Sequence, residues 1–379
     1  MTAALSSVAE LLVRLVEIDS TNPLLVTGGA GEGELVRFLA DRLRNAAFEV
    51  DVWEVLPGRP NLVARLAGSD GGRSLMICGH TDVVGADPAA FKPRLENGRI
   101  YGRGAFDMKG GLAAAIIAAE RVSKTTSLTG DLFLAFCIDE EWRSEGAEAL
   151  VQRYRADAAI LPEPSNLEVV TAHGGFAWYD VVSDGVEAPG GDPDHGVDSI
   201  SLLGPILAGI AELDRALTSR ASATWGRGSI HASMIGGGVT YPSYPAQCRL
   251  AVERCLIPGE SVVDADAELA NLLEAAEQAD RRFRGSCERI IGRDAVVLDP
   301  EEPVVKAVVE AAERELDRRI EPRFDIGWMD SGVLSDAGIP CVVFGPSGAG
   351  EHTPEEWVDV DSLLACSHVL ERAIRTFCE

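Results

Sequence analysis

The sequence lacks the features that would direct the chain to a membrane or to nucleic acid. Its N-terminal segment has neither a basic region nor a long apolar run, so we expect neither a signal peptide nor a membrane span. Positive charge is scarce, because 34 Lys and Arg oppose 60 Asp and Glu, for a formal net charge of −26. Such an excess repels nucleic acid and anionic lipid, so neither partner is expected, and solubility is its simplest explanation.

Closely paired cysteines and dinucleotide-binding glycines are also missing. The eight cysteines show no CxxC spacing, and with no export signal we expect reduced thiols in a cytoplasmic protein. Two segments, GGAGEGE and GRGAFD, are rich in glycine but do not match the G-x-G-x-x-G order. No predicted strand leads into the first, and in the second Asp107 stands where the third glycine should be. We therefore predict no nucleotide cradle.

What is present is an α/β pattern. A chain of 379 residues is too long for one ordinary core, so two domains are expected. Short, continuous apolar runs, typical of buried strands, alternate with amphipathic helices in the first 160 residues and again near the end. The predicted strands of this kind cover residues 50–55, 61–66, 74–78, 132–138, 158–161 and 341–344.

Between these two parts lies a segment of different character. From Phe176 the sequence alternates as a half-exposed strand does, and a helix over 197–217, two strands and a helix over 261–279 follow. This order predicts a compact α+β unit inserted into the first domain. We therefore expect a catalytic domain over 1–175 and 293–379, interrupted by a smaller domain over 176–292.

Polar residues with metal-binding chemistry follow the predicted strands. His80 and Asp82 are two residues apart on an extended segment, so both project to one side at the strand's carboxyl end, where α/β sheets bind ligands. Other strands and loops add further candidates, and each alone has a plain structural explanation, such as a turn for the proline-flanked glutamate. These further candidates are Asp107, Glu140, Glu141, Glu163 and His352.

The combined set predicts a two-metal centre. Two histidines with several carboxylates form a nitrogen and oxygen ligand set that suits zinc, cobalt or manganese. A single zinc ion would leave too many acids without a counter-charge, whereas two cations that share one carboxylate would neutralise them.

The same motifs resemble a known family. GHTDVV, GRGAFDMKGG, DEE, LPEP and the final histidine are similar to the dizinc aminoacylase and carboxypeptidase family of acetylornithine deacetylase, succinyl-diaminopimelate desuccinylase and carboxypeptidase G. STNP, GRPNLVARL, VERCLIPGE and FGPSGAGEH match as well, so the resemblance spans nearly the whole chain. It implies a zinc-peptidase-like α/β domain, with a mixed, mostly parallel central sheet flanked by helices. A ferredoxin-like α+β lid that often dimerises would interrupt this domain.

The resemblance also implies roles for the metal-binding residues. Asp107 would bridge two ions, most simply zinc, with cobalt or manganese as alternatives. His80 and Glu163 would bind one ion, and Glu141 and His352 would bind the other. The Asp107–Met108 peptide bond would be cis.

The remaining roles concern proton transfer and the substrate. By resemblance, Glu140 would act as the general base toward an amide bond, and Asp82 would hydrogen-bond His80 and fix its tautomer. Arg254 would hold a substrate carboxylate, unless it forms only a surface ion pair, and Gly348 would contribute to substrate binding.

The predicted lid departs from the family at one position. Relatives carry an oxyanion-stabilising histidine there, but in GVEAPGGDPDHGVDSI its place is taken by Pro189, which has no side-chain donor. His195, six residues along, is a candidate substitute, although a solvated loop histidine would look the same. Because relatives contribute the missing histidine across a dimer, Pro189 also weakens the implied homodimer through the lid.

Three hypotheses follow. The first is a two-metal amidohydrolase that cleaves an N-acyl amino acid or a small peptide-like amide. The second keeps the metal site but changes its chemistry, to amide formation or a specialised biosynthetic hydrolysis, because of Pro189. The third is a metal-binding homologue with little turnover, which an intact Glu140 argues against.

Overall fold

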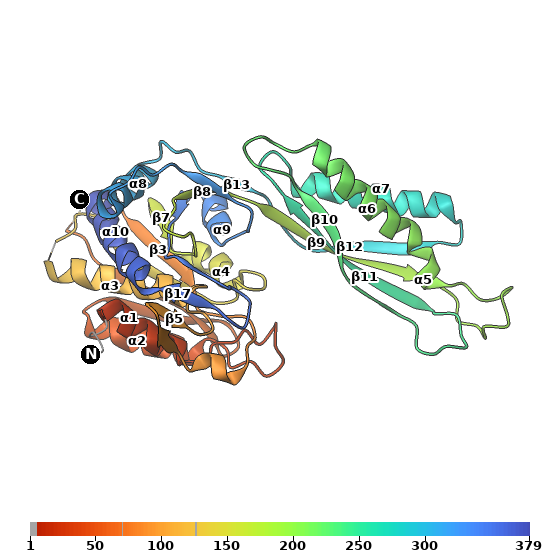
Figure 1. Cartoon of the computed structure of the whole chain (residues 1–379), viewed down its shortest axis with the longest axis horizontal. Helices are drawn as coiled ribbons and strands as arrows, with labels where there is room; N and C mark the ends of the chain where they lie inside the picture. The colour runs from red at the N-terminus through yellow and green to blue at the C-terminus, as the bar shows by residue number, and fades with distance from the viewer. Residues whose placement is uncertain (1–5, 70, 126) are drawn as a thin grey trace. The chain divides into compact units, whose positions relative to one another are not determined.

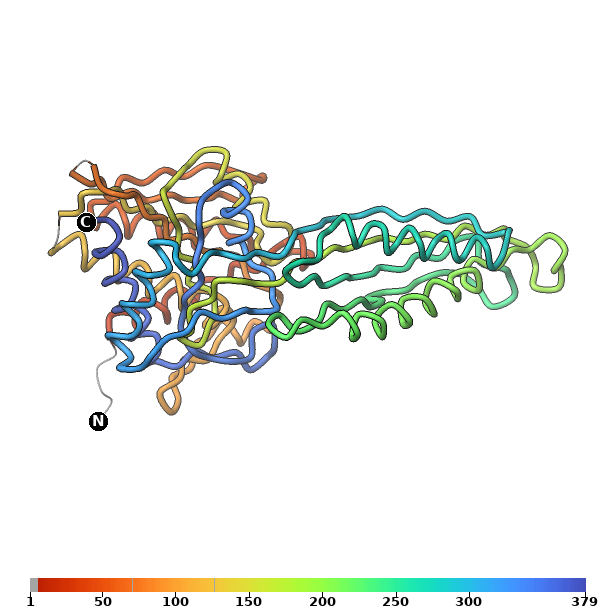
Figure 2. The backbone as a smooth tube through the Cα atoms, turned by 90° about the horizontal axis from the view of Figure 1, so that it is seen from above, coloured from red at the N-terminus to blue at the C-terminus, as the bar shows by residue number. Residues whose placement is uncertain are grey.

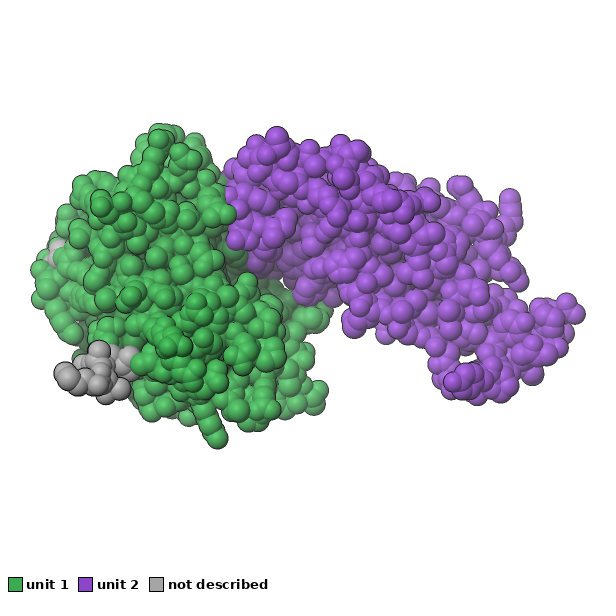
Figure 3. All heavy atoms as spheres, in the orientation of Figure 1, with its two compact units in different colours: residues 1–171, 298–323, 329–379 green, residues 172–297, 324–328 purple. Residues whose placement is uncertain are grey.

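The structure is a computed structural model that describes residues 6–69, 71–125 and 127–379. The described chain divides into two compact units (Figure 3). Unit 1 comprises the N-terminal part to residue 171 together with 298–323 and 329–379, and unit 2 comprises 172–297 with 324–328. The sequence placed the inserted domain at 176–292, without the short return segment 324–328.

A mixed sheet forms the centre of unit 1 (Figure 1). Its middle strands β6, β3, β7 and β15 are parallel neighbours, and antiparallel strands flank them on both sides. In the described part of the chain the sheet has nine strands, in the order β1 (Glu49–Leu56), β2 (Arg59–Leu66), β6 (Leu132–Cys137), β3 (Leu75–His80), β7 (Ala158–Leu161), β15 (Cys341–Val343), β8 (Val170–His173) and β13 (Val296–Val297), with β14 (Arg323–Asp325) pairing with β8.

Helices bury the sheet because its central strands are apolar on both faces. All residues of β3 and β6 are buried, and alternate residues such as Leu75 and Ile77 point into one large core. The helices that contribute to this core are α1 (Ser7–Val16), α2 (Gly33–Asn45), α3 (Lys109–Thr125), α8 (Pro303–Leu316) and α10 (Val360–Cys378). Two further helices, α4 (Glu145–Arg153) and α9 (Ser331–Asp336), contact each other.

Unit 1 also contains a small antiparallel sheet. Its strands are β16 (Gly348–Ala349), β17 (Trp357–Asp359), β5 (Arg99–Tyr101) and β4 (Arg94–Glu96), and a short 3-10 helix over Pro88–Phe91 precedes it. The sequence did not predict this sheet, because its strands are too short to show a period. It joins the segment before Asp107 to the segment after His352.

Unit 2 has its own sheet and core. The strand order is β10 (Ser229–Gly237), β11 (Gln247–Leu256), β9 (Gly175–Asp184) and β12 (Arg284–Arg293), all antiparallel. Alternate residues of β9 are buried under α6 (Gly204–Ser219) and α7 (Val262–Ala279), which run alongside the strands in Figure 2.

The α/β fold class predicted from the sequence is confirmed, with local differences. The predicted single helix over 197–217 is wrong, because α5 (Ser199–Leu202) and α6 are separated at Leu203. Pro205 at the start of α6 has no N–H to continue the hydrogen bonds of a longer helix. None of the helices in the described part of the chain has the length and apolar character needed to span a bilayer.

Candidate metal centre

The carboxyl ends of three neighbouring strands carry most of the candidate site. β6, β3 and β7 are parallel, and the pairing of His80 with Cys137 brings the ends of β3 and β6 level. The acidic run 139–141 follows β6, and Glu163 follows β7 after a single proline. Parallel pairing therefore brings together side chains that are far apart in the sequence.

Two groups of three side chains could each hold a metal ion, and they share Asp107. In the first, His80 Nε2 lies 3.1 Å from Asp107 Oδ1 and 3.6 Å from Glu163 Oε1. In the second, His352 Nε2 lies 3.2 Å from Asp107 Oδ2 and 2.9 Å from Glu141 Oε2. The two oxygens of Asp107 thus face different histidines, which is the arrangement that a carboxylate bridging two ions requires.

The charge of the cluster fits divalent cations. Four carboxylates, at positions 107, 140, 141 and 163, gather around two imidazoles. Glu163 Oε1 is buried and accepts no hydrogen bond from any residue that the structure describes. A buried carboxylate oxygen without a partner is costly, and a bound cation would remove that cost.

The pKa values of the cluster reflect the same excess of negative charge. Burial raises the pKa of Glu140 and of Glu163 well above the usual range. Hydrogen bonds with Asp107 and Glu141 raise the pKa of His352 to about 10. Burial alone would lower the pKa of His80, but the charge of Glu163 and the contact with Asp107 raise it well above normal. Protons therefore compete with cations for this site, so metal binding should weaken as the pH falls.

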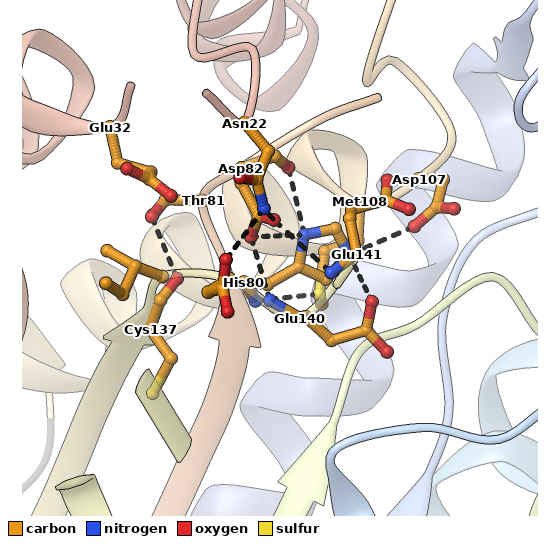
Figure 4. Close-up of polar contacts among 12 residues, drawn as sticks. Asn22, Glu32, His80, Thr81, Asp82, Asp107, Met108, Cys137, Glu140 and Glu141 are labelled. Atoms are coloured by element: carbon orange, nitrogen blue, oxygen red, sulfur yellow. Dashed lines mark hydrogen bonds and ion pairs between the residues drawn. The ribbon is translucent and has the colours of Figure 1, made fainter. Parts of the chain in front are cut away.

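Asp82 connects the two strand ends. Its backbone carbonyl lies 3.0 Å from His80 Nδ1, while its nearest carboxylate oxygen is 3.6 Å from that nitrogen. The carboxylate instead accepts the backbone N–H groups of Glu140 and Glu141, each at 3.2 Å. The contact expected between Asp82 and His80 is thus made by the backbone carbonyl oxygen of Asp82, which accepts the hydrogen bond, and not by its carboxylate (Figure 4).

A buried polar network extends behind Asp82. Asn22 Nδ2 donates to Asp82 Oδ2 at 2.8 Å and to Asp139 Oδ1 at 3.0 Å. Arg59 donates to Asp139 Oδ1 at 3.0 Å and pairs through two nitrogens with the fully buried Glu32. Neither Asn22 nor Arg59 was predicted to have a role, although both lie in motifs that resemble the family, STNP and GRPNLVARL.

Asp107 lies at the end of the loop that follows β5. The Asp107–Met108 peptide bond is cis, as the resemblance implied. The backbone N–H of Asp107 donates to Glu356 at 3.0 Å, and this glutamate was also missed by the sequence analysis. His352 lies in the loop between β16 and β17, and its side chain is 55% exposed.

The predicted substrate residues belong to neither of the two ligand groups. Arg254 lies in unit 2, is fully buried, and donates to Glu260, Glu268 and the carbonyl of Cys255. Four of its five N–H groups are used in these contacts, and its predicted role toward a substrate carboxylate stays a prediction.

Gly348 and His195 have other surroundings. A Cβ at Gly348 would fall 2.3 Å from Trp357 O and 2.6 Å from the ring of Phe106, so packing alone explains this glycine. His195 lies in unit 2 with its side chain 79% exposed, and its Nδ1 is 2.8 Å from Asp192. Their predicted roles stay predictions.

Comparison with known proteins identifies the class. A profile of peptidase family M20/M25/M40 matches residues 76–376. The chain is 30% identical over 383 residues to N-formyl-4-amino-5-aminomethyl-2-methylpyrimidine deformylase of Bacillus subtilis (strain 168), covering 90% of this chain and 88% of that protein. It is 27% identical to acetylornithine deacetylase of Photorhabdus laumondii, covering 100% and 99% of the two chains.

Solved structures share the fold. An M20 family metallo-carboxypeptidase from Sulfolobus solfataricus superposes with a TM-score of 0.80 at 18% identity, covering 98% of this chain and 99% of that one. A dinuclear metal-binding peptidase of the M20 family from Bacillus subtilis gives a TM-score of 0.70 at 16% identity, covering 98% and 97%.

Fold and sequence together define a metallo-hydrolase that acts on amide bonds. More narrowly, the chain belongs to peptidase family M20/M25/M40.

Proposed function

We propose that the protein is a two-metal amidohydrolase that removes a small acyl group from an amine, such as an N-acyl amino acid. The observation that carries this proposal is the pair of ligand groups that meet at Asp107, with one carboxylate oxygen near each histidine. The names of two relatives, a deformylase and an acetylornithine deacetylase, support an acyl group of one or two carbon atoms.

His80, Asp107 and Glu163 would hold one ion, and Asp107, Glu141 and His352 would hold the other. Zinc suits this donor set best, and cobalt or manganese also fit it. Two such ions, when bound, would polarise the amide carbonyl and lower the pKa of a water molecule.

Glu140 would move the proton. Its Oε2 lies 3.9 Å from His80 Nε2, so it borders the ligands without completing either group. Burial raises its pKa, and a carboxylate with a raised pKa is suited to take a proton near neutral pH. Glu140 would take a proton from water as the oxygen attacks the carbonyl carbon. It would then return that proton to the amine nitrogen as the C–N bond breaks.

Asp82 would orient this machinery. By accepting the Nδ1 hydrogen of His80 on its carbonyl, it would leave Nε2 with a free lone pair toward Asp107 and Glu163. Its carboxylate would hold the backbone of Glu140 and Glu141 at the same time.

The oxyanion donor is the part of this mechanism that the sequence leaves open. Pro189 forms an isolated antiparallel β-bridge with Ser243, and its side chain has no hydrogen-bond donor. A changed reaction on the same metal site is therefore the second candidate, and homodimerisation and a cytoplasmic location stay predictions.

Glu140→Gln tests the mechanism. In assays with N-formyl, N-acetyl and N-succinyl amines and added zinc or cobalt, we expect kcat to fall by about 10²- to 10⁴-fold. The number of ions per chain should stay at about two, because Glu140 belongs to neither ligand group. Elemental analysis after dialysis measures that number.

Glu145→Gln is the matched control, since Glu145 is an exposed glutamate at the start of α4. It should leave kcat unchanged. Full turnover in Glu140→Gln would contradict the assigned base, and an active wild-type chain without metal would contradict the two-metal function.

A further inference from the structure

We propose that Arg103 and Glu356 are positioning residues that hold His352 and Asp107 at the spacing required for one of the two ions. This inference rests on the proposed two-metal function and extends it to residues that are not ligands themselves. It stands on a buried ion pair that contacts both ligand-bearing segments, 102–107 and 350–356.

Glu356 binds the segment that carries Asp107. One of its oxygens, Oε1, accepts the backbone N–H groups of Phe106 and Asp107 at 2.9 and 3.0 Å. The other, Oε2, accepts the N–H of Gly104 at 2.9 Å and Arg103 Nη1 at 2.5 Å. Glu356 is 2% exposed, so these contacts are shielded from water.

Arg103 connects that segment to the loop of His352. While its Nη1 pairs with Glu356, its Nη2 donates to the carbonyl oxygen of Thr353 at 3.0 Å. Thr353 is the residue directly after His352. The planar guanidinium therefore fixes the distance between two segments that are about 250 residues apart in the sequence.

The small sheet of unit 1 brings these segments together. Antiparallel pairing places Tyr101 opposite Trp357, and the ladder continues with the N–H of Gly102 donating to the carbonyl of Glu356 at 3.0 Å. Glu356 thus lies beside the start of the 102–107 segment, where its side chain can reach three backbone N–H groups, those of Gly104, Phe106 and Asp107.

His352 needs such support more than the other ligands do. His80 is the last residue of β3 and Glu163 follows β7, both buried strands of the central sheet, whereas His352 lies in a loop with a half-exposed side chain. Its φ of +59° is also uncommon for a residue with a Cβ, so the surrounding contacts must impose it.

Glu356→Gln tests the proposal. An amide nitrogen in place of one oxygen would face backbone N–H groups and lose at least one of the contacts to the 102–107 segment. We expect the zinc ion held by Asp107, Glu141 and His352 to bind about 10- to 100-fold more weakly, and the ion that shares only Asp107 to lose less affinity, as measured by titration calorimetry of the metal-free protein. In a His352→Ala background, which lacks one ligand, Glu356→Gln should weaken zinc binding by a smaller factor than it does in the wild-type chain.

A second measurement needs no metal. In the metal-free protein, Glu356→Gln should speed the hydrogen exchange of the Gly104, Phe106 and Asp107 amides by about tenfold or more, because these groups donate to the substituted side chain. Arg103→Lys keeps the positive charge but loses the planar guanidinium that donates to two acceptors at once, so it should weaken binding of the same ion. This variant replaces Glu356→Gln in the test if Glu356→Gln does not fold.

Glu355→Gln is the matched control. Glu355 is the neighbouring glutamate, and its exposed ion pair with Arg94 at 3.4 Å joins β4 to the 350–356 segment. It should change neither ion affinity nor amide exchange.

The proposal is overturned if both ions keep their affinity in Glu356→Gln, if both weaken equally, or if exchange is unchanged. A wild-type chain that binds fewer than two ions would instead overturn the proposed function. In that case the exchange experiment would still decide whether Glu356 holds the 102–107 segment.

Discussion

His173 is a buried histidine that the proposed chemistry does not use, and its burial makes stability depend on pH. It is 2% exposed, its Nδ1 lies 2.8 Å from the carbonyl oxygen of Gly174, and its ring packs edge-on against Trp328. Burial lowers its pKa to about 4 from an ordinary 6.5. Between these two pH values the unfolded chain binds a proton that the folded chain does not.

The free energy of unfolding should therefore fall as the pH drops from 6.5 toward 4, with a contribution of about 3 kcal/mol from this residue. His173→Asn keeps a nitrogen donor for Gly174 and removes the titration. Urea unfolding of both proteins across this range should show a shallower pH dependence in the variant. Equal slopes would mean that His173 titrates normally in the folded state.

Single residues also show which features of the candidate site could be predicted from the sequence and which could not. The motifs pointed to side chains that the structure brings together in two candidate ligand groups, because their positions at or after the ends of buried strands are visible in the sequence. They did not reveal that Asp82 would use its carbonyl toward His80, or that Arg254 would be buried among the acids of unit 2. Those outcomes depend on rotamers and on neighbours from distant segments, which a linear pattern does not contain.

At the scale of elements, the start of α3 packs directly on the connection that leads to Glu163. A Cβ at Gly111 would lie 1.9 Å from the backbone carbonyl oxygen of Pro162, which cannot move as a side chain tip can. We expect Gly111→Ala to lower the free energy of unfolding by about 1–3 kcal/mol through overpacking. Gly111→Ala should also lower the affinity for the ion that Glu163 helps to bind.

Gly204→Ala provides the comparison, because Gly204 begins α6 and a Cβ there would meet nothing within 4 Å. Its stability should be unchanged or slightly higher. Urea unfolding and zinc titration measure both effects, and equal behaviour of the two alanine variants would show that the α3 contact tolerates a methyl group.

Some strands were predicted from the sequence better than others. The strand over 158–161 was predicted at its observed bounds, because a continuous apolar run is typical of a strand buried on both faces. The strands of the small sheet were missed because they are two or three residues long, and β12 was missed because none of its residues is fully buried. Yet the small sheet aligns Glu356 with the Asp107 loop.

At the scale of the whole molecule, the two units have separate apolar cores, and every candidate ligand lies in unit 1. Calorimetry should therefore resolve two unfolding transitions, of which zinc stabilises one. At a free metal concentration 100 times Kd, each bound ion contributes about 2.7 kcal/mol to that transition.

A chelator should lower the temperature of the transition that zinc stabilises and leave the temperature of the other transition unchanged. If a single transition shifts as a whole, the units unfold cooperatively. If neither shifts, the chain binds no zinc in its folded state.

The position of the inserted unit has a consequence for synthesis. His80, Asp107 and Glu163 all precede unit 2 in the chain, whereas His352 follows it. A nascent polypeptide therefore contains His80, Asp107 and Glu163 before the insertion is translated, but it lacks His352 until the ribosome has passed residue 352. The candidate group of Asp107, Glu141 and His352 can thus be completed only after the whole insertion has been synthesised.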